Sequence, residues 1–374
     1  MRFVASLIAV TLIACPASAA SATDDRVIER LLTQDLVPLL LDDGIGGAEV
    51  AVHIGGRTLF FNYGLADMAT RRPVSPDALF NLASVRKVFE AIVLAQAVQR
   101  GELSFDEPVA NYVTELKAGG TIRKVTFGQL ATHTSGLLLP TDHPPWPDRG
   151  YTLPEFLSTL NAWTPQPGHE PGFQHEYTHA GYVLLQLALE RRFAVPIGDL
   201  IEQRVLKPLG LTATMLPTRP LDGEHEPLPG AVQGYGGDGK PIGIPGNQQS
   251  YYEFPGTGQM FSSARDLAIL IAAHLGDIPV APELRAAMQL AQRSVVRISP
   301  HISQALAWEV SEPAGGPVII DKPGGIDNAS AYIGMVPERQ LGIVILVNRG
   351  DRNPHEVARK IILPSLARGL SEFP

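Results

Sequence analysis

Strand-like patterns occur at both ends of the chain, with helical patterns between them, and this order strongly constrains the fold. Near the start, β-branched and apolar residues predict strands over 49–54 and 58–65, joined by a turn at Gly55-Gly56. Near the end, the pattern predicts strands over 305–310, 317–321, 329–336 and 341–348, with a hairpin turn at 337–340. These strands fit a single sheet made by both ends of the chain, with the middle inserted between them.

Helical patterns fill the rest of the chain. Apolar periodicity predicts helices over 24–41, 84–100, 180–192 and about 353–367, and Gly101 is placed to stop the second of them. We therefore expect a sheet lobe from about 24–83 and 300–374, and a largely helical lobe between those two segments.

The first residues have the pattern of a targeting segment. Arg2, the apolar run over 3–13 and the small residues Ala17-Ser18-Ala19 predict a signal peptide over residues 1–19, which leaves a domain over 20–374. The run Leu12-Ile13-Ala14-Cys15 leaves a second interpretation open, in which a lipid is attached to Cys15. Either interpretation predicts an exported, periplasmic protein. Because Cys15 is the only cysteine, the mature domain has neither a disulfide nor a thiol nucleophile.

Charge and hydropathy narrow the range of partners. The net charge is −8 without a basic run, which argues against nucleic acid as a ligand. Beyond the first residues there is no apolar run long enough to predict stable membrane insertion. We expect a monomer that acts on a small molecule.

Ser84-Val85-Arg86-Lys87 places a hydroxyl and an amine three residues apart at the start of a predicted helix. Residues with this spacing share a helix face, so the two groups can meet. A serine hydroxyl needs a base beside it to act as a nucleophile, and a lysine among apolar residues has a lowered pKa that suits this role. The motif alone is weak, because a match of this length arises by chance.

A second lysine motif strengthens the interpretation. Asp321-Lys322-Pro323-Gly324-Gly325 lies at the end of a predicted strand and is followed by another strand and a hairpin. A Lys-x-Gly strand beside a Ser-x-x-Lys helix is typical of penicillin-recognising enzymes.

The whole pattern resembles the serine β-lactamase and penicillin-binding superfamily, and within it the class C branch. The stretches that carry the resemblance follow in family order: FNLASVRKVFEAIVLAQAVQRGELSFDEPVANYV, FGQLATHTSGL, QRVLKPLGLTATM, FSSARDLAIL, QLAQRSVVRISPHISQALAWEV and DKPGGIDNASAYIGMVPERQLGIVILVNR. The resemblance implies an α/β (α+β) fold in which helices flank an antiparallel sheet, with an inserted all-helical lobe and the active site between the two lobes. His133, in the second stretch, is interpreted as part of the scaffold.

The resemblance also implies roles for particular residues. Ser84 would be the nucleophile, with Lys87, Tyr177 and Lys322 as its catalytic partners. The N–H groups of Ser84 and Gly325 would form the oxyanion hole. His179, Pro323 and Gly324 would border the substrate, and Asn353 would lie where a substrate carboxylate is held. No metal or other cofactor is implied.

Two of these positions depart from the family pattern. His179 replaces an asparagine in the Tyr-x-Asn element, and Pro323 replaces the threonine of Lys-Thr-Gly. Proline has neither a hydroxyl nor an N–H, so one donor to the substrate is lost. The departures weaken the expectation of efficient cephalosporin hydrolysis and favour an esterase or a peptidase relative.

His175-Glu176-Tyr177-Thr178-His179 also matches H-E-x-x-H, the signature of helical zinc peptidases. A zinc site requires both histidines on one face of a continuous helix and a third ligand, for which Glu202 is a candidate. Pro171-Gly172 stands just before the motif, and the helical pattern begins only near Ala180. The sequence therefore favours a loop around Tyr177.

Three kinds of function remain open. We expect an exported serine hydrolase that works through an acyl-enzyme, most simply a class C-type β-lactamase. A carboxylesterase or a D-alanyl-D-alanine peptidase of the same fold is the first alternative, and a non-catalytic binder of penicillin or peptidoglycan is the second. The expected partners are accordingly a small β-lactam, an ester or a D-alanine peptide.

Overall fold

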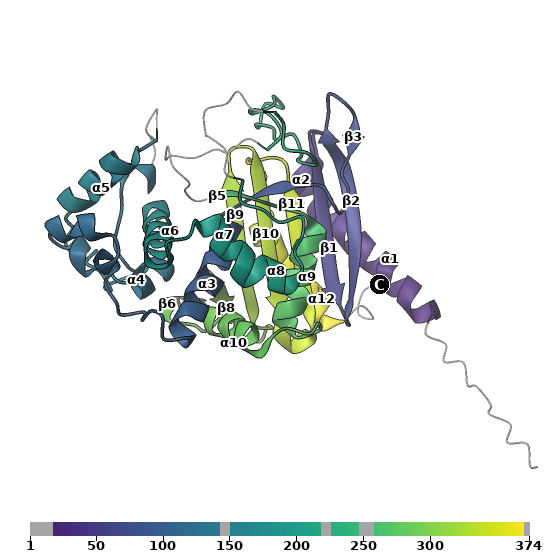
Figure 1. Cartoon of the computed structure of the whole chain (residues 1–374). Helices are drawn as coiled ribbons and strands as arrows, with labels where there is room; N and C mark the ends of the chain where they lie inside the picture. The colour runs from purple at the N-terminus through teal and green to yellow at the C-terminus, as the bar shows by residue number, and fades with distance from the viewer. Residues whose placement is uncertain (1–17, 143–149, 218–225, 247–257, 370–374) are drawn as a thin grey trace, which may run out of the picture.

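The computed structural model describes residues 18–142, 150–217, 226–246 and 258–369. Its main feature is a nine-stranded antiparallel sheet in the order β3-β2-β1-β11-β10-β9-β8-β7-β6 (Figure 1). The strands are β1 (Gly47–Ile54), β2 (Arg57–Asp67), β3 (Arg72–Pro73), β6 (Val296–Ser299), β7 (Ile302–Gln304), β8 (Glu309–Ser311), β9 (Ile319–Ile326), β10 (Ala329–Val336) and β11 (Leu341–Val347).

The two ends of the chain meet in the middle of this sheet. Strand β1 pairs with β11 from Ala48 opposite Val347 to Ile54 opposite Leu341. Strand β10 pairs with both β11 and β9, so the hairpin near the end of the chain continues the sheet directly from the first strand. The predicted antiparallel sheet made by both termini is confirmed.

Both faces of the sheet are covered, which explains the nearly continuous apolar sequence of β11. Ile343, Ile345 and Val347 belong to one buried cluster, and Val344 and Leu346 belong to another on the opposite face. This alternation is the period of two that a strand imposes on its side chains.

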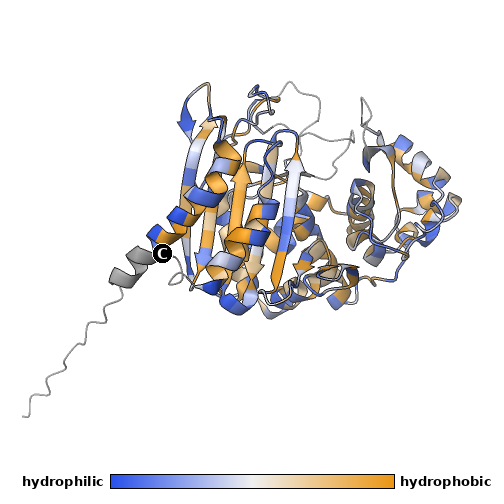
Figure 2. Ribbon diagram, turned by 180° about the vertical axis from the view of Figure 1, so that it is seen from behind, coloured by the Kyte–Doolittle hydropathy of each residue, from blue (hydrophilic) through white to orange (hydrophobic). Residues whose placement is uncertain are grey.

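Helices from both termini cover one face of the sheet, as Figure 2 shows from behind. They are α1 (Ser18–Leu31), the π-helical turn η1 (Leu32–Leu36), α2 (Val37–Leu41), α11 (His355–Val357), η9 (Ala358–Ile362) and α12 (Leu363–Arg368). The opposite face carries α9 (Ala264–Leu275), which packs so closely that an added Cβ at Gly342 would lie 2.2 Å from Cγ2 of Ile271. Helix α10 (Pro282–Ala291) packs beside it against α3 (Lys87–Gln99).

A separate helical part lies beside the sheet in Figure 1, with α4, α5 and α6 at its centre. Its elements are η3 (Val109–Asn111), η4 (Thr114–Ala118), η5 (Ile122–Lys124), α4 (Phe127–Ala131), η6 (Pro140–Asp142), α5 (Leu153–Ala162) and α6 (His179–Phe193). The chain then returns through α7 (Ile197–Ile201), η7 (Glu202–Leu206) and α8 (Lys207–Leu209). A two-stranded sheet of β4 (Phe80–Ala83) and β5 (Gly258–Ser262) lies next to the start of α3. The middle of the chain thus supplies the helical part and also α9 and α10, which cover the sheet.

Strands β4, β5, β6 and β7 were not predicted, and two predicted strands differ from the observed ones. Residues 305–308 are not a strand: they form a buried connection between β7 and β8, in which Ala307 has a φ of +62° and donates its N–H to Ala131. The Lys322 motif does not end a strand but lies within β9, which continues to Ile326. Beyond Asp321, β9 pairs only with β10 among the described residues, so a proline is tolerated there.

The predicted signal peptide, its cleavage site and Cys15 fall on residues 1–19, of which 1–17 lie outside the described part of the chain. Among the helices that are described, none is both long and apolar enough to cross a lipid bilayer.

Candidate active site

Ser84 lies at a sharp corner between a strand and a helix. Strand β4 ends at Ala83, and the 3₁₀ turn η2 (Ser84–Arg86) leads directly into α3. Ala83 has φ +45° and ψ −129°, a backbone conformation that is strained for an alanine and is found mostly where the surroundings enforce it. The side chain of Asn81 helps to hold this corner, because its Oδ1 accepts the N–H of Ala83 at 2.9 Å.

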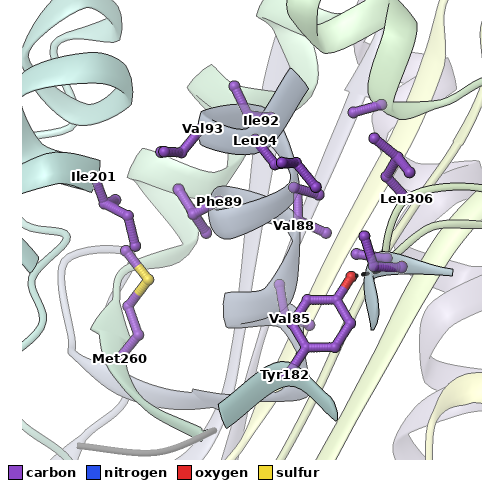
Figure 3. Packing of buried hydrophobic residues seen from close by; sticks show 14 of the residues in the cluster. Val85, Val88, Phe89, Ile92, Val93, Leu94, Tyr182, Ile201, Met260 and Leu306 are labelled. Atoms are coloured by element: carbon purple, nitrogen blue, oxygen red, sulfur yellow. Dashed lines mark hydrogen bonds between the residues drawn. The ribbon is translucent and has the colours of Figure 1, made fainter. Parts of the chain in front are cut away.

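The residues around this corner are deeply packed. Every residue over 78–97 is buried except Ser84, which is partly exposed. Figure 3 shows Val85 of η2 and Val88 and Phe89 of α3 among other buried side chains, including Tyr182, Leu306 and Met260. The Ser84 hydroxyl therefore lies on a tightly packed, mostly apolar part of the core and faces its solvent-accessible side.

Two groups converge on that hydroxyl. Nζ of Lys87 donates a hydrogen bond to Oγ of Ser84 at 3.0 Å, and the phenol of Tyr177 bonds to the same oxygen at 2.6 Å. Lys87 and Ser84 meet because they are three residues apart on one helical turn, as the sequence predicts. Tyr177 comes from the loop before α6, 93 residues further along the chain.

Lys87 is fully buried, and this burial lowers the pKa of its amine to about 7. The positive charge of Arg86 lowers it further, whereas Glu90 and Asp142 act in the opposite direction. A lysine in this state can be neutral near physiological pH and can accept a proton.

Lys322 approaches Tyr177 from the sheet. Its Nζ lies 4.9 Å from the centre of the Tyr177 ring, and Nζ of Lys87 lies 5.2 Å from the same centre. Lys322 is 1% exposed, and its ammonium has no hydrogen-bond partner among the described residues. Two lysine amines therefore flank the phenol ring.

The residue before Lys322 anchors β9 from the other face of the sheet. The carboxylate of Asp321 accepts hydrogen bonds from Arg359 and, at 2.7 Å, from the hydroxyl of Tyr332. Arg359 also donates to Glu309 on β8 at 2.6 Å. His355 lies near these two carboxylates, but Arg359 already satisfies them, so the group is an ion-pair network rather than a free metal site.

Strand β9 passes directly against the start of α3. An added Cβ at Gly324 would lie 2.6 Å from the carbonyl oxygen of Leu82 and 3.0 Å from the backbone nitrogen of Ser84. Only glycine permits this approach. At Gly325, which is exposed, an added Cβ would meet nothing within 4 Å, so the strand opens to solvent just beyond the serine.

The other predicted substrate-binding residues are placed unequally. His179 is the first residue of α6, its ring centre lies 5.5 Å from that of Tyr177, and its Nδ1 lies 3.5 Å from Asp142. Pro323 is half-buried opposite Tyr332. Asn353 is exposed, and its Oδ1 accepts the N–H of His355 at 3.0 Å. None of the hydrogen bonds found in the described chain joins Asn353 to the serine, the two lysines or Tyr177.

The structure contradicts the zinc-peptidase interpretation of residues 175–179. Helix α6 begins only at His179, so the two histidines of the motif do not share a helix face. Nε2 of His175 bonds to Oε1 of Gln304 at 3.1 Å, and Glu176 bonds to Nδ1 of His169 at 2.8 Å. Glu202 pairs with Lys207 at 2.9 Å.

The sequence analysis missed Asp142 near the centre and interpreted His133 only as part of the scaffold. Asp142 accepts the N–H of His179 and lies close enough to Lys87 to affect its pKa. His133 stacks on Tyr177, with ring centres 4.2 Å apart. Neither position has a local signal, because each contact joins segments that are more than 30 residues apart.

Known proteins resemble this chain over nearly its whole length. A beta-lactamase of Pseudomonas fluorescens is 25% identical over 369 residues, covering 90% of this chain and 97% of that protein. A beta-lactamase of Escherichia coli (strain K12) is 26% identical, covering 92% and 93%. A crystal structure of a class C beta-lactamase in complex with cefoxitin superposes with a TM-score of 0.74 at 26% identity, covering 93% of this chain and 99% of that one.

A further solved structure, of a beta-lactamase/D-alanine carboxypeptidase from Pseudomonas syringae, has a TM-score of 0.74 at 23% identity and shows the shared fold, with 92% of this chain and 98% of that chain covered. The family model described as Beta-lactamase matches residues 25–366. This match spans most of the chain, and the predicted superfamily and fold are confirmed: the chain belongs to the beta-lactamase family.

Proposed function

We propose that the chain is an exported serine hydrolase that opens β-lactam amides through an acyl-enzyme on Ser84. The observation that carries the proposal is the convergence of Lys87 and Tyr177 on one hydroxyl, at 3.0 and 2.6 Å. A serine whose hydroxyl has an amine and a phenol within hydrogen-bond distance meets the geometric requirement for an activated nucleophile, since either group can take up its proton once deprotonated.

In the acylation step, Oγ of Ser84 attacks the lactam carbonyl carbon while its proton passes to the Tyr177–Lys87 pair. The negative charge that develops on the carbonyl oxygen is held by the N–H groups of Ser84 and Gly325. When the intermediate collapses, the C–N bond breaks and the departing nitrogen takes up the proton. Water then attacks the ester carbonyl carbon and gives a proton to the same Tyr177–Lys87 pair. The C–O bond to Ser84 breaks, Oγ takes up that proton, and the carboxylic acid product leaves.

Lys322 serves two purposes in this proposal. Its charge lies beside the Tyr177 ring, where it can stabilise negative charge that develops during the reaction. The same charge attracts an anionic substrate to the open side of β9, next to Pro323. The ring centre of His179 lies 5.5 Å from that of Tyr177, and its imidazole can donate to a substrate amide.

The decisive experiment compares a chromogenic cephalosporin with a short-chain nitrophenyl ester on the purified protein. We expect hydrolysis of both, with a Ser84→Ala variant inactive toward each. Cephalosporin hydrolysis that persists in the Ser84→Ala variant would contradict the proposal. An adduct on Ser84 that is stable for hours after exposure to penicillin, seen by mass spectrometry, would instead indicate a penicillin binder.

A carboxylesterase or D-alanyl-D-alanine peptidase is the second candidate, and Pro323 is the observation that favours the esterase in particular, because a peptide ending in D-alanine carries a carboxylate. The missing hydroxyl removes one donor for a substrate carboxylate, which costs about 1–3 kcal/mol of binding in the transition state. An ester without a carboxylate would not suffer this loss. Ester turnover far above cephalosporin turnover in the assay described here would support this candidate.

We also propose that the protein is a periplasmic monomer, in line with the targeting segment over residues 1–19. Fractionation of cells that express the full chain would place it with periplasmic proteins, or with membranes if Cys15 carries a lipid. Light scattering of the purified protein tests the expected mass of one chain.

A further inference from the structure

His133 occupies an unusual position in the loop that follows α4. Its side chain is 0% exposed, and its φ of +54° lies in the left-handed region. Histidine, asparagine and aspartate tolerate this region better than other non-glycine residues do, although at a cost in free energy. A buried polar residue in a strained backbone conformation persists only where its contacts stabilise it, so these contacts point to its role.

The contacts of His133 converge on the segment that carries Tyr177. Its carbonyl oxygen accepts the N–H of Glu176 at 2.6 Å, and its Nδ1 accepts the N–H of Thr178 at 3.3 Å. Between these two bonds, its ring lies on that of Tyr177 with the planes inclined by 31°. The residue before Tyr177, Tyr177 itself and the residue after it are therefore all held by one histidine.

The other side of the imidazole is fixed as well. Its ring centre lies 5.0 Å from that of Tyr182, whose hydroxyl donates to the carbonyl of Ala131 at 2.9 Å. Tyr182 is fully buried in α6. The imidazole is thus wedged between a rigid core tyrosine and the phenol that reaches Ser84.

We propose that His133 is a positioning residue that holds the Tyr177 phenol on the Ser84 hydroxyl. The inference rests on the proposed function, in which Tyr177 handles the serine proton. Tyr177 is 36% exposed and precedes the first turn of α6, so its own helix does not fix it. A displacement of about 1 Å at such a centre can cost on the order of a hundredfold in rate.

The role requires a neutral imidazole. Nδ1 must keep its lone pair to accept the Thr178 N–H, so the ring hydrogen lies on Nε2. Burial, together with the positive charges of Lys322 and Lys87 and the neighbouring His175 and His179, holds the pKa of His133 well below its usual value. The ring therefore remains neutral at physiological pH and adds no positive charge beside Tyr177.

Two substitutions separate the parts of this role. His133→Asn keeps an acceptor near the position of Nδ1 and tolerates the left-handed backbone, but it removes the stacked ring. His133→Phe keeps a ring and removes the acceptor. His274→Asn is the matched control, because His274 is another neutral histidine with buried ring nitrogens, and it lies on α9 with its ring packed on Trp308.

The experiment measures the second-order rate of Ser84 acylation by a fluorescent penicillin and, in parallel, of its labelling by a fluorophosphonate. We expect His133→Phe to lower both rates at least about tenfold, and His133→Asn to lower them less. His274→Asn should lower the melting temperature while leaving both rates within about twofold. In a Tyr177→Phe background, His133→Phe should add no further loss, because its effect passes through the phenol.

Rates within twofold of wild type in His133→Phe would overturn the proposal. So would a full additional loss in the Tyr177→Phe background, or an equal loss of rate in His274→Asn. If the wild-type protein reacts with the fluorophosphonate but not with penicillin, β-lactam hydrolysis is refuted. The role of His133 is then still tested, because the fluorophosphonate rate reports the reactivity of Ser84. Failure to react with either reagent would overturn both proposals.

Discussion

The lowered pKa of Lys87 predicts how acylation depends on pH. With the pKa at about 7, about 9% of the amine is neutral at pH 6 and about 91% at pH 8. A lysine at its ordinary value of 10.5 would be only about 0.3% neutral at pH 8. If neutral Lys87 is needed to take up the Ser84 proton, kcat/KM should rise about tenfold between pH 6 and pH 8 and then level off.

The assay is the initial rate of nitrophenyl ester or cephalosporin hydrolysis at substrate concentrations far below KM, from pH 5.5 to 9. Under this condition the profile reports groups of the free enzyme. Lys87→Arg is the matched variant, since it keeps the positive charge and cannot lose it in this range. It should lose the rise along with most of the rate. A wild-type profile that is flat to pH 8.5, or one that still rises steeply at pH 9, would refute the assignment.

Two further predictions test the frame around the site. Burial lowers the pKa of His274 from 6.5 to about 3, so between these pH values the unfolded chain binds a proton that the folded chain excludes. The free energy of unfolding should therefore decrease as the pH is lowered from 6.5 toward 3. At pH 5 this group lowers the free energy of unfolding by about 2 kcal/mol. Urea unfolding at pH 8 and pH 5 should therefore show a smaller decrease in stability for His274→Asn than for the wild type, by about this amount. Equal decreases in the two proteins would contradict this prediction. Gly324→Ala should lower the rate of Ser84 acylation at least about tenfold, because the added methyl group would push β9 away from the serine. Its circular dichroism spectrum should be unchanged. Gly120→Ala, where an added Cβ meets nothing within 4 Å, should keep the wild-type rate.

Local sequence patterns were sufficient to predict the structure where the contacts join residues that are close in sequence. The hairpin of β10 and β11 has a buried apolar alternation on both faces and a turn with Pro337 at its start. The pair Ser84 and Lys87 follows from helical geometry alone. Helix α6 was predicted to within one residue at each end, since Thr178 caps it and its apolar run is uninterrupted.

The sequence misled where distant packing decides the backbone. Residues 305–308 are apolar and suggest a strand, but Ala307 turns into a left-handed conformation to donate its N–H to Ala131. The Pro-Gly-Gly after Lys322 suggests a strand end, yet pairing with β10 carries β9 through to Ile326. The meeting of Tyr177 with Ser84 followed only from the family resemblance, because no local rule joins residues 93 positions apart.

The neighbours Asp321 and Lys322 show how the sheet prepares the site. Successive side chains of a strand point to opposite faces, so Asp321 meets Arg359 and Tyr332 behind the sheet while Lys322 points toward Tyr177. The buried carboxylate is fully paired and fixes β9 in place. The buried ammonium has no hydrogen-bond partner in the part of the chain that is described, and such a charge is destabilising in isolation.

The buried charge of Lys322 destabilises the fold but can serve the reaction. An unpaired, desolvated cation interacts more strongly with an incoming anion, or with a phenol that gains negative charge, than a solvated lysine would. Because Arg359 and Asp321 hold the strand rigid, this cation does not relax away from Tyr177 when the charge on the phenol changes. The same reasoning applies to Lys87, whose burial in α3 makes its amine a proton acceptor beside Ser84. In both cases an apolar, well-packed frame holds a buried amine where the reaction needs it: charged at Lys322 and able to accept a proton at Lys87.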